Sequence, residues 1–331
     1  MIVSKTPQRI SLGGGGSDLP FYANKHGGSL ITAAIDKYIY ITVSPRTNDR
    51  TFKLNYSKTE IIEAVDDVKH PLIKECLKLT NIDKPLEIHS VAQMPAGAGL
   101  GSSSAFTVGL LNALYYYRGE IVSKYKLAED TSYITMDILK EPCGKQDQYA
   151  SAFGSLVQLS INTKGRVTVT PINISHSTLQ KLENNLMMFY TGFTRYANEI
   201  LADQKQTARQ ESPDIYEHYH EIKRIGKESK RCLEKGDLTR FGEWMNIHWE
   251  LKRKISSKMS NTQIDQWYRL ALENGAIGGK IIGAGGGGFL LLYVDRNHNH
   301  IRELMEKEGL VYNPFKFDFD GSRIVYDGGR F

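Results

Sequence analysis

Cysteine is scarce in this sequence. Cys76, Cys143 and Cys232 are the only three among 331 residues, and they lie far apart. An odd number without a CxxC pair argues against both a disulfide framework and a zinc site. Few cysteines, together with a first segment that has no signal-peptide pattern, are typical of proteins in a reducing compartment. We therefore expect a cytoplasmic protein.

The chain also lacks a strong excess of either charge. Its 42 Lys and Arg residues exceed its 37 Asp and Glu residues by 5. Proteins that bind nucleic acid usually gather Lys and Arg on one face or in runs. The densest basic stretch here, Lys223–Lys235, has the composition of a solvated helix face. We expect no nucleic-acid partner, while the mild basic excess suits a small anionic ligand.

A long uninterrupted hydrophobic run is missing too. Gly275–Val294 comes nearest to a membrane span in hydropathy, but it contains Lys280 and many glycines. A spanning helix needs about 20 predominantly apolar residues, and each glycine weakens a helix by roughly 1 kcal/mol. We expect no membrane segment.

What the first half does have is an alternation of strand-like and helix-like segments. Short apolar runs bounded by turn residues predict strands, and longer runs with helical spacing predict helices. Strands are predicted over Ile2–Ile10, Ser29–Ile35, Tyr38–Val43 and Leu86–Ala92, with a hairpin of Ser155–Ile161 and Arg166–Ile172; helices are predicted over 103–117 and 126–139 and from Gln146 onward.

Polar residues interrupt this pattern near Asn173–Thr178. Beyond them the sequence predicts a strand over Leu186–Tyr190, a mostly helical stretch to about Asn274, two strands flanking residues 283–288, and a helix over 298–308. The spacing i, i+3, i+4, i+7 that marks an amphipathic helix is found at Ile264, Trp267, Tyr268 and Ala271. The pattern as a whole predicts two α+β domains, residues 1–175 and 176–331, with a cleft between them.

Three glycine clusters stand out, at residues 13–16, 97–101 and 283–288. Such clusters are most often tight turns, but the middle one lies between a predicted strand and a predicted helix. Glycine lets backbone N–H groups converge, and a helix start favours a phosphate. The stretch has neither the Gly-Lys-Ser/Thr of a Walker loop nor the G-x-G-x-x-G of a dinucleotide site. The sequence therefore predicts phosphate binding on another scaffold.

Taken together, the clusters resemble the motifs of the galactokinase, homoserine kinase, mevalonate kinase and phosphomevalonate kinase (GHMP) superfamily. The matching segments, which stand in the family's order and span nearly the whole chain, are Arg9–Pro20, Pro95–Ala105 and Gly283–Phe289. This resemblance implies a two-domain α+β fold, with an N-terminal domain of the ribosomal-protein-S5 type and a C-terminal ferredoxin-like domain. It also implies ATP and Mg²⁺ as cofactors.

The resemblance assigns roles to residues as well. Asp147, within Cys143–Tyr149, matches the catalytic aspartate, and Arg9 matches the arginine near it. A carboxylate beside an acceptor hydroxyl can orient it and take its proton during phosphoryl transfer. Without the resemblance, Asp147 is interpreted as a carboxylate at a helix start and Arg9 as a surface residue. The implied ATP loop comprises Pro95, Gly97, Ala98, Gly99, Leu100, Gly101, Ser102, Ser103 and Ser104.

The acceptor site is expected around the same motifs. Asp18 can accept hydrogen bonds from a polyol, or else it caps the segment that follows. Lys145 and Arg195 are predicted to clamp a distal phosphate from the two walls of the cleft, unless both are solvated surface cations. The remaining residues expected to bind the acceptor are Ser17, Gln146, Gly285 and Gly286.

The magnesium site is less well defined by the motifs. Ser103 matches the family's metal-binding serine, but the place of the family's magnesium glutamate falls on Thr135. Asp137 stands two residues later and Asp130 about one turn earlier, and Asp137 is the candidate for the carboxylate. The alternative is that Ser103, water and ATP oxygens hold Mg²⁺, an ion that usually keeps several waters.

Three further segments narrow the resemblance. Residues 13–28, 144–150 and 190–195 resemble bacterial D-glycero-D-manno-heptose 7-phosphate kinases and the kinase part of fucokinases. Such enzymes phosphorylate the anomeric hydroxyl, toward nucleotide-activated heptose for surface glycans. Three alternatives stay open: a free-sugar kinase of fucokinase or galactokinase type, an isoprenoid-pathway kinase, and a sugar or ATP sensor without turnover. The sequence also leaves open whether the protein is a monomer or a homodimer.

Overall fold

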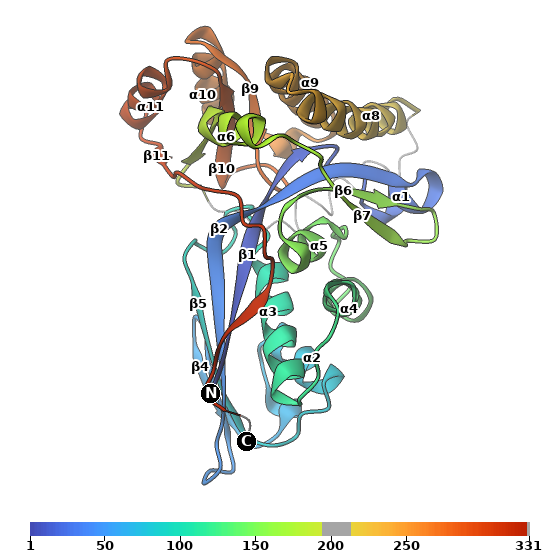
Figure 1. Ribbon diagram of the computed structural model, residues 1–331, viewed down its shortest axis with the longest axis vertical. Coiled ribbons are helices and arrows are strands. Elements are labelled where there is room, and N and C mark those ends of the chain that lie inside the picture. Colours follow the sequence, from blue (N-terminus) through green and yellow to red (C-terminus); the bar gives the residue numbers. More distant parts are fainter. Residues whose placement is uncertain (194–212, 330–331) are drawn as a thin grey trace.

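The computed structural model of the chain describes residues 1–193 and 213–329, which form two sheets with helices packed on them (Figure 1). The larger sheet has the order β12-β1-β2-β5-β3-β4, with β6 and β7 branching from β2. Its strands are β1 (Ile2–Gly13), β2 (Gly28–Pro45), β3 (Phe52–Asn55), β4 (Thr59–Ile62), β5 (Leu86–Ala92), β6 (Leu156–Ile161), β7 (Val167–Pro171) and β12 (Arg323–Asp327). The antiparallel pairing of β6 with β7 confirms the predicted hairpin.

The smaller sheet has the order β11-β8-β10-β9. Its strands are β8 (Leu186–Tyr190), β9 (Ala276–Ile281), β10 (Phe289–Val294) and β11 (Val311–Tyr312). Strands β9 and β10 are antiparallel neighbours on either side of residues 283–288, as predicted. The last strand, β12, leaves this region and pairs with β1 of the larger sheet. The division at residues 175 and 176 stays a prediction.

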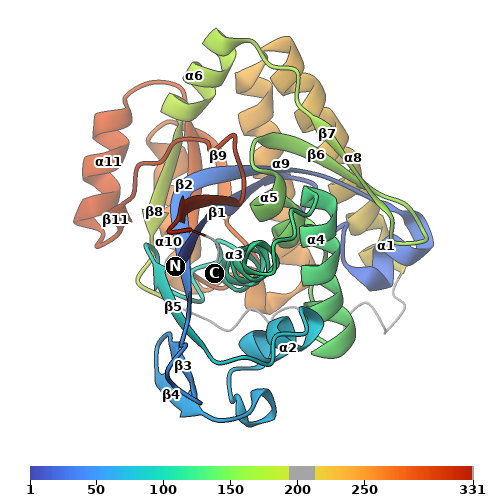
Figure 2. The same cartoon turned by 60° about the horizontal axis from the view of Figure 1, so that its bottom comes forward.

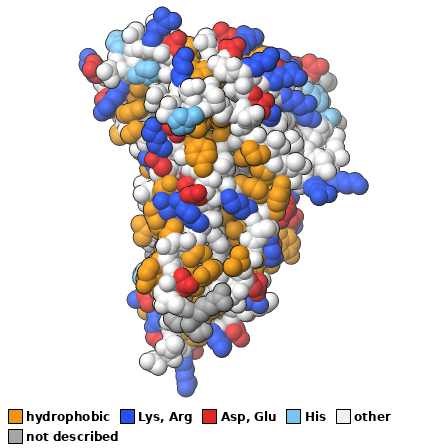
Figure 3. Space-filling view, in the orientation of Figure 1, with side chains coloured by type: hydrophobic (Ala, Val, Ile, Leu, Met, Phe, Trp, Pro, Cys, Tyr) orange, Lys and Arg blue, Asp and Glu red, His pale blue; other side chains and the backbone are white. Residues whose placement is uncertain are grey.

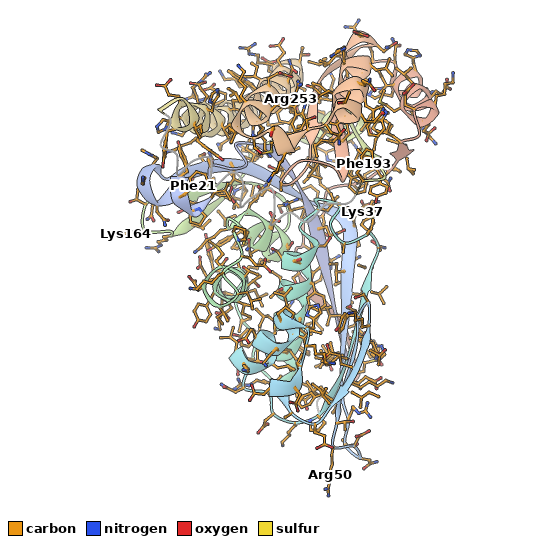
Figure 4. All side chains as sticks on the ribbon, turned by 180° about the vertical axis from the view of Figure 1, so that it is seen from behind. Phe21, Lys37, Arg50, Lys164, Phe193 and Arg253 are labelled. Carbon is orange, nitrogen blue, oxygen red and sulfur yellow. The ribbon has the colours of Figure 1, made fainter. Side chains whose placement is uncertain are left out.

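Strand β2 corrects one expectation. The sequence predicted two strands separated at Asp36 and Lys37, but the structure has one strand of 18 residues. Opposite β1 the register jumps from Pro7–Tyr38 to Gln8–Ile35, so Asp36 and Lys37 form a bulge. The Asp36 N–H donates to the Lys316 carbonyl at 2.9 Å, which holds the bulge inside the sheet. Lys37 marks this point in Figure 4, and Arg50 marks the far tip of the long strands.

The bulge separates two environments along β2. All eight residues of Gly28–Ile35 are buried, whereas burial alternates over Tyr38–Val43. Burial without alternation is expected where both faces of a strand are covered. Helix α8 (Pro213–Lys235) of the second half packs on β2, and helices α3 (Ser102–Tyr117) and α5 (Gln146–Phe153) of the first half also pack on it. The buried part of the sheet therefore lies at the junction of the two halves, between their helical layers (Figure 1).

Among the helices of the first half, α3 carries the glycine loop at its start to this junction. The helices of the first half are α1 (Pro20–His26), η1 (Val65–Asp67), α2 (Pro71–Leu79), α3 (Ser102–Tyr117), α4 (Lys124–Ser132), η2 (Tyr133–Ile138) and α5 (Gln146–Phe153). Helix α3 contacts β1 and β2 on one side and α2 and α4 on the other (Figure 2). The single helix predicted over 126–139 is instead helix α4 followed by η2, a π-helical turn.

Between residues 213 and 273 the second half is mostly helical, as predicted. Its helices are α6 (His176–Asn185), α8 (Pro213–Lys235), α9 (Leu238–Ile255), η3 (Ser257–Met259), α10 (Thr262–Glu273) and α11 (His298–Lys307). The four residues with amphipathic spacing are all buried on α10, which confirms that helix. One hydrophobic cluster contains side chains of β1 and β2 together with β8 and β10, so the two sheets share a core.

None of the helices in the described part of the chain combines the length and the hydrophobicity needed to cross a lipid bilayer. Acidic and basic side chains are interspersed over the face of the molecule shown in Figure 3.

Candidate active site

The second and third glycine clusters contact each other backbone to backbone. A Cβ on Gly99 would lie 2.5 Å from the carbonyl oxygen of Ile282, and one on Gly288 would lie 2.3 Å from that of Ala98. A Cβ on Gly283 would lie 2.8 Å from the Gly99 carbonyl oxygen. Distances this short leave no space for any side chain. Gly283 and Gly288 of the third cluster therefore have to be glycine because they support the second cluster.

All three clusters line one cleft at the junction of the two halves, with a cavity of about 190 Å³. Strand β1, the loop after it, the start of α3, the start of α5, helix α9 and the loop between β9 and β10 contribute to its walls. Its polar and charged lining is Arg9, Ser11, Asp18, Ser102, Ser103, Ser104, Glu141, Gln146, Asp147 and Lys252.

The predicted ATP loop leads into helix α3. Gly101 precedes the helix with a φ of 74°, in the left-handed region that favours glycine. Among the described residues no side chain caps this helix start, so the first-turn N–H groups of the serines are directed to the cleft. Ala98 and Leu100 are buried in the shared core and anchor the loop. Pro95 is exposed at the start of the segment, outside the cleft lining.

Arg9 and Asp147, 138 residues apart in sequence, form a two-pronged ion pair. Arg9 Nε donates to Asp147 Oδ1 at 2.7 Å, and Arg9 Nη2 donates to Asp147 Oδ2 at 2.6 Å. Arg9 Nη1 donates to the Gly99 carbonyl at 2.5 Å, which ties the pair to the ATP loop. The Arg9 side chain is 5% exposed and that of Asp147 is 29% exposed, so the carboxylate faces the cleft.

A second carboxyl group, that of Asp18, lies on the same wall. Asp18 Oδ1 accepts from the N–H of Gly16 at 3.1 Å, and Oδ2 accepts from the N–H of Gln146 at 3.2 Å. Burial, and next the charge of Asp147, raises the pKa of Asp18. Within the described residues, Ser11 Oγ and Gln146 Nε2 are buried without a hydrogen-bond partner. Unpartnered polar groups around a carboxyl are suited to binding the hydroxyls of a polyol.

Two of the residues predicted to bind the acceptor, Ser17 and Gly286, do not line the cleft. The Ser17 hydroxyl is fully buried and donates to the carbonyl of Gly14 at 2.8 Å, so it holds the loop rather than lining the cleft. Gly285 lines the cleft, whereas the N–H of Gly286 is bound to the Met259 carbonyl at 2.7 Å. Arg195 lies outside the described residues.

Lys145 is turned away from the cleft. Its ammonium group donates to Glu129 Oε2 at 2.7 Å and to the Gly165 carbonyl at 3.0 Å. It lines two neighbouring cavities instead, one of them shared with Asp137. Asp137 is exposed on η2 and does not line the cleft that contains Ser103.

Sequence reasoning missed two charged residues of the cleft. Glu141 follows η2 and lines the cleft; burial raises the pKa of its carboxyl group. Thr135, where motif matching put the magnesium carboxylate, is buried and donates to the Thr131 carbonyl at 2.9 Å. Lys252, from α9, is also buried and lines the cleft. Neither Glu141 nor Lys252 belongs to a motif. Lys252 stands in a basic run that suggests a solvated helix end.

This fold and this cleft define a family. Residues 61–155 match the N-terminal domain of the GHMP kinases, and residues 229–307 match their C-terminal domain. The chain belongs to the GHMP kinase family. The resemblance seen in the motifs and the expected two-domain α+β fold class are both confirmed.

Individual relatives are similar over almost the whole chain. The D-glycero-alpha-D-manno-heptose 7-phosphate kinase of Campylobacter jejuni is 30% identical, and the match covers 97% of each chain. A galactokinase of Pyrococcus furiosus is 26% identical over 89% of this chain and 90% of its own. The solved structure of a D-glycero-D-manno-heptose 1-phosphate kinase from Bacteroides thetaiotaomicron has a TM-score of 0.82 at 25% identity, covering 99% of this chain and 100% of that one.

Proposed function

We propose that this protein is an ATP-dependent sugar kinase whose acceptor is D-glycero-D-manno-heptose 7-phosphate and whose product is the 1,7-bisphosphate. The observation that carries the proposal is the Arg9–Asp147 pair, held beside the ATP loop by the bond from Arg9 to Gly99. The named relatives support the choice of acceptor. A sensor without turnover would not need a carboxylate oriented in this way at the end of the phosphate loop.

The proposed reaction moves one phosphoryl group. The oxygen of the anomeric hydroxyl forms a bond to the γ-phosphorus of ATP while the bond from that phosphorus to the β,γ-bridging oxygen breaks. ADP leaves with the bridging oxygen, and the hydroxyl proton passes to the Asp147 carboxylate. Arg9 fixes the orientation of Asp147 through two hydrogen bonds, and N–H groups at the start of α3 receive the ATP phosphates.

The cleft also fits the magnesium ion that ATP would bring. Ser103 and Glu141 supply a hydroxyl and a carboxylate oxygen to one cavity, and oxygen ligands are those that Mg²⁺ prefers. A desolvated carboxyl with a raised pKa gains most from a neighbouring cation. When bound, Mg²⁺ neutralises charge on the phosphate oxygens. We assign Ser103 and Glu141 as its protein ligands in place of Asp137.

Replacing Glu141 with glutamine should weaken magnesium binding. We expect the Mg²⁺ concentration for half-maximal ATP binding to rise at least about tenfold, the usual scale for disturbing a metal site. Calorimetric titration of ATP at a series of Mg²⁺ concentrations measures this without turnover. Asp137→Asn, which changes an exposed carboxylate outside the cleft, is the control. A shift in Asp137→Asn and none in Glu141→Gln would return the ligand role to Asp137.

The acceptor is tested by ADP release across sugars and sugar phosphates. We expect kcat/KM for the heptose 7-phosphate to exceed that for the free heptose by about ten- to a hundredfold, the gain from one charge-assisted contact. Arg195→Ala should remove this gain and leave the free sugar unaffected, whereas Lys145, already paired with Glu129, is not expected to contribute. Equal use of both sugars would favour a fucokinase-like enzyme, and turnover of mevalonate alone would favour the isoprenoid alternative.

We further propose a cytoplasmic protein that acts in the synthesis of nucleotide-activated heptose for surface glycans. The sugar phosphate and ATP are its proposed partners. The resemblance leaves the choice between a monomer and a homodimer to a measurement of mass in solution.

A further inference from the structure

The side chain of Lys252 extends from helix α9 of the second half into the cleft between the two halves. It lies in the last turns of α9, yet its side chain is only 7% exposed and reaches the cleft. Its Nζ donates to the Gly283 carbonyl at 2.9 Å. Gly283 packs against Gly99 of the ATP loop, so the ammonium group lies close to that loop. In Figure 4 its sequence neighbour Arg253 marks this end of α9, above the larger sheet.

The ammonium group of Lys252 has donors to spare. An ammonium carries three N–H donors, and within the part of the chain that the structure describes only the Gly283 carbonyl accepts one. No carboxylate of the described residues forms an ion pair with it. A buried cation without a paired anion is costly and is retained where an anion binds.

The other cation of the cleft, Arg9, is already committed. Two of its nitrogens donate to Asp147 and the third donates to the Gly99 carbonyl. The charge of Arg9 is therefore balanced before any ligand enters. Lys252 is the charge that remains for a phosphate group among the described residues lining this cleft.

We infer that Lys252 binds the γ-phosphate of ATP, the phosphoryl group that is transferred, from the side opposite the start of α3. The inference rests on the proposed kinase function. The transferred group has to lie between the ATP loop and Asp147, and Lys252 borders that space through Gly283. A cation there stabilises the transition state most strongly, because charge redistributes over the phosphoryl oxygens at that point of the reaction.

The electrostatic surroundings make this contact dependent on pH. Burial, and next the charge of Arg9, lowers the pKa of Lys252 to about 8, against an opposing effect of Asp18. Lys280 of β9 and His248 of α9 also face it, and the carboxyl groups of Glu141 and Asp147 line the same cleft. Lys252 is charged at neutral pH and loses its proton as the pH rises through about 8.

Nucleotide binding tests the inference without an acceptor sugar. Native protein should bind the non-hydrolysable ATP analogue AMP-PNP more tightly than ADP, and Lys252→Met should reduce that preference about tenfold or more. Lys254→Met changes an exposed lysine two residues away on the same helix and should leave the preference as it is. Circular dichroism confirms that each variant is folded. An unchanged preference in folded Lys252→Met would overturn the inference.

Measurements of turnover distinguish a contact of Lys252 with the γ-phosphate from a purely structural role of this residue. Lys252→Met should lower kcat by about a hundredfold or more, as removal of a positioned transition-state donor does. In native protein kcat/KM should fall about tenfold per pH unit above the Lys252 pKa of about 8. In Lys252→Arg that fall should disappear, because arginine stays charged. A fall retained in Lys252→Arg would contradict the inference. An AMP-PNP preference that depends on Lys252, in a protein that phosphorylates no sugar, would instead refute only the proposed function.

Discussion

Asp147→Asn is expected to lower kcat by at least about a hundredfold, the usual scale for losing a positioned acid or base, while ATP still binds. Asparagine has nearly the same shape and can still accept a hydrogen bond from Arg9, but its amide cannot take a proton at neutral pH. Binding of ATP depends on the loop that ends at Gly101 and on the start of α3, neither of which this substitution changes.

Two measurements check this expectation. ADP release at saturating ATP and sugar phosphate gives kcat, and calorimetry with ATP and Mg²⁺ gives the affinity. The matched control is Asp137→Asn, the same chemical change at an exposed site outside the cleft, which should leave kcat at the native value. Near-native turnover in Asp147→Asn would reduce Asp147 to a carboxylate at the start of α5 and shift the weight of catalysis to the cations of the cleft.

The second large effect is expected from Gly99→Val, which should abolish measurable ATP binding. Gly99 has a φ of 82°, and a Cβ there would lie 2.5 Å from the Ile282 carbonyl oxygen. Valine would therefore strain the loop and push it off residues 282 and 283 at the same time. The N–H groups that receive phosphate would no longer converge.

The control variant Gly119→Val distinguishes the effect of backbone strain from the effect of displacing the ATP loop. Gly119 has nearly the same φ, 78°, but a Cβ there meets nothing within 4 Å. We expect this control to lose about 1–3 kcal/mol of stability through backbone strain alone and to bind ATP normally. Calorimetric titration with ATP and thermal unfolding of both variants measure the two effects. Full ATP affinity in folded Gly99→Val would show that the loop does not hold the nucleotide.

Local patterns predicted much of the fold, because short apolar runs and glycine positions depend on neighbours in sequence. Strands β5, β8 and β10, the hairpin β6–β7 and the amphipathic helix α10 were all foreseeable in this way. The bulge at Asp36 was not, because a distant segment at residues 316 and 317 holds it in the sheet. The π-helical turn η2 was not predicted either, because the spacing of apolar residues does not distinguish it from an α-helix.

In the candidate site, too, features with a local sequence signature were predictable and contacts between distant residues were not. The ATP loop has a local signature, whereas the contact of Arg9 with Asp147 joins residues 138 apart and was expected only from the resemblance. Whether a single charged side chain lies in the cleft or in solvent depends on its burial, and one charged residue forms no sequence pattern from which burial could be predicted. Lys145 was expected in the cleft but is paired with Glu129, whereas Lys252, which no motif singles out, is buried at the site.

The contact between Gly99 and Gly283 has a mechanical consequence. The two backbones touch directly here, so a change in the angle between the two halves of the molecule would turn about this contact. The ATP loop then lies at the pivot, where a rotation displaces atoms least. Groups of the second half that lie farther from this contact would move most. Opening by such a hinge would let the sugar product leave and a new acceptor enter while the nucleotide stays bound at the ATP loop.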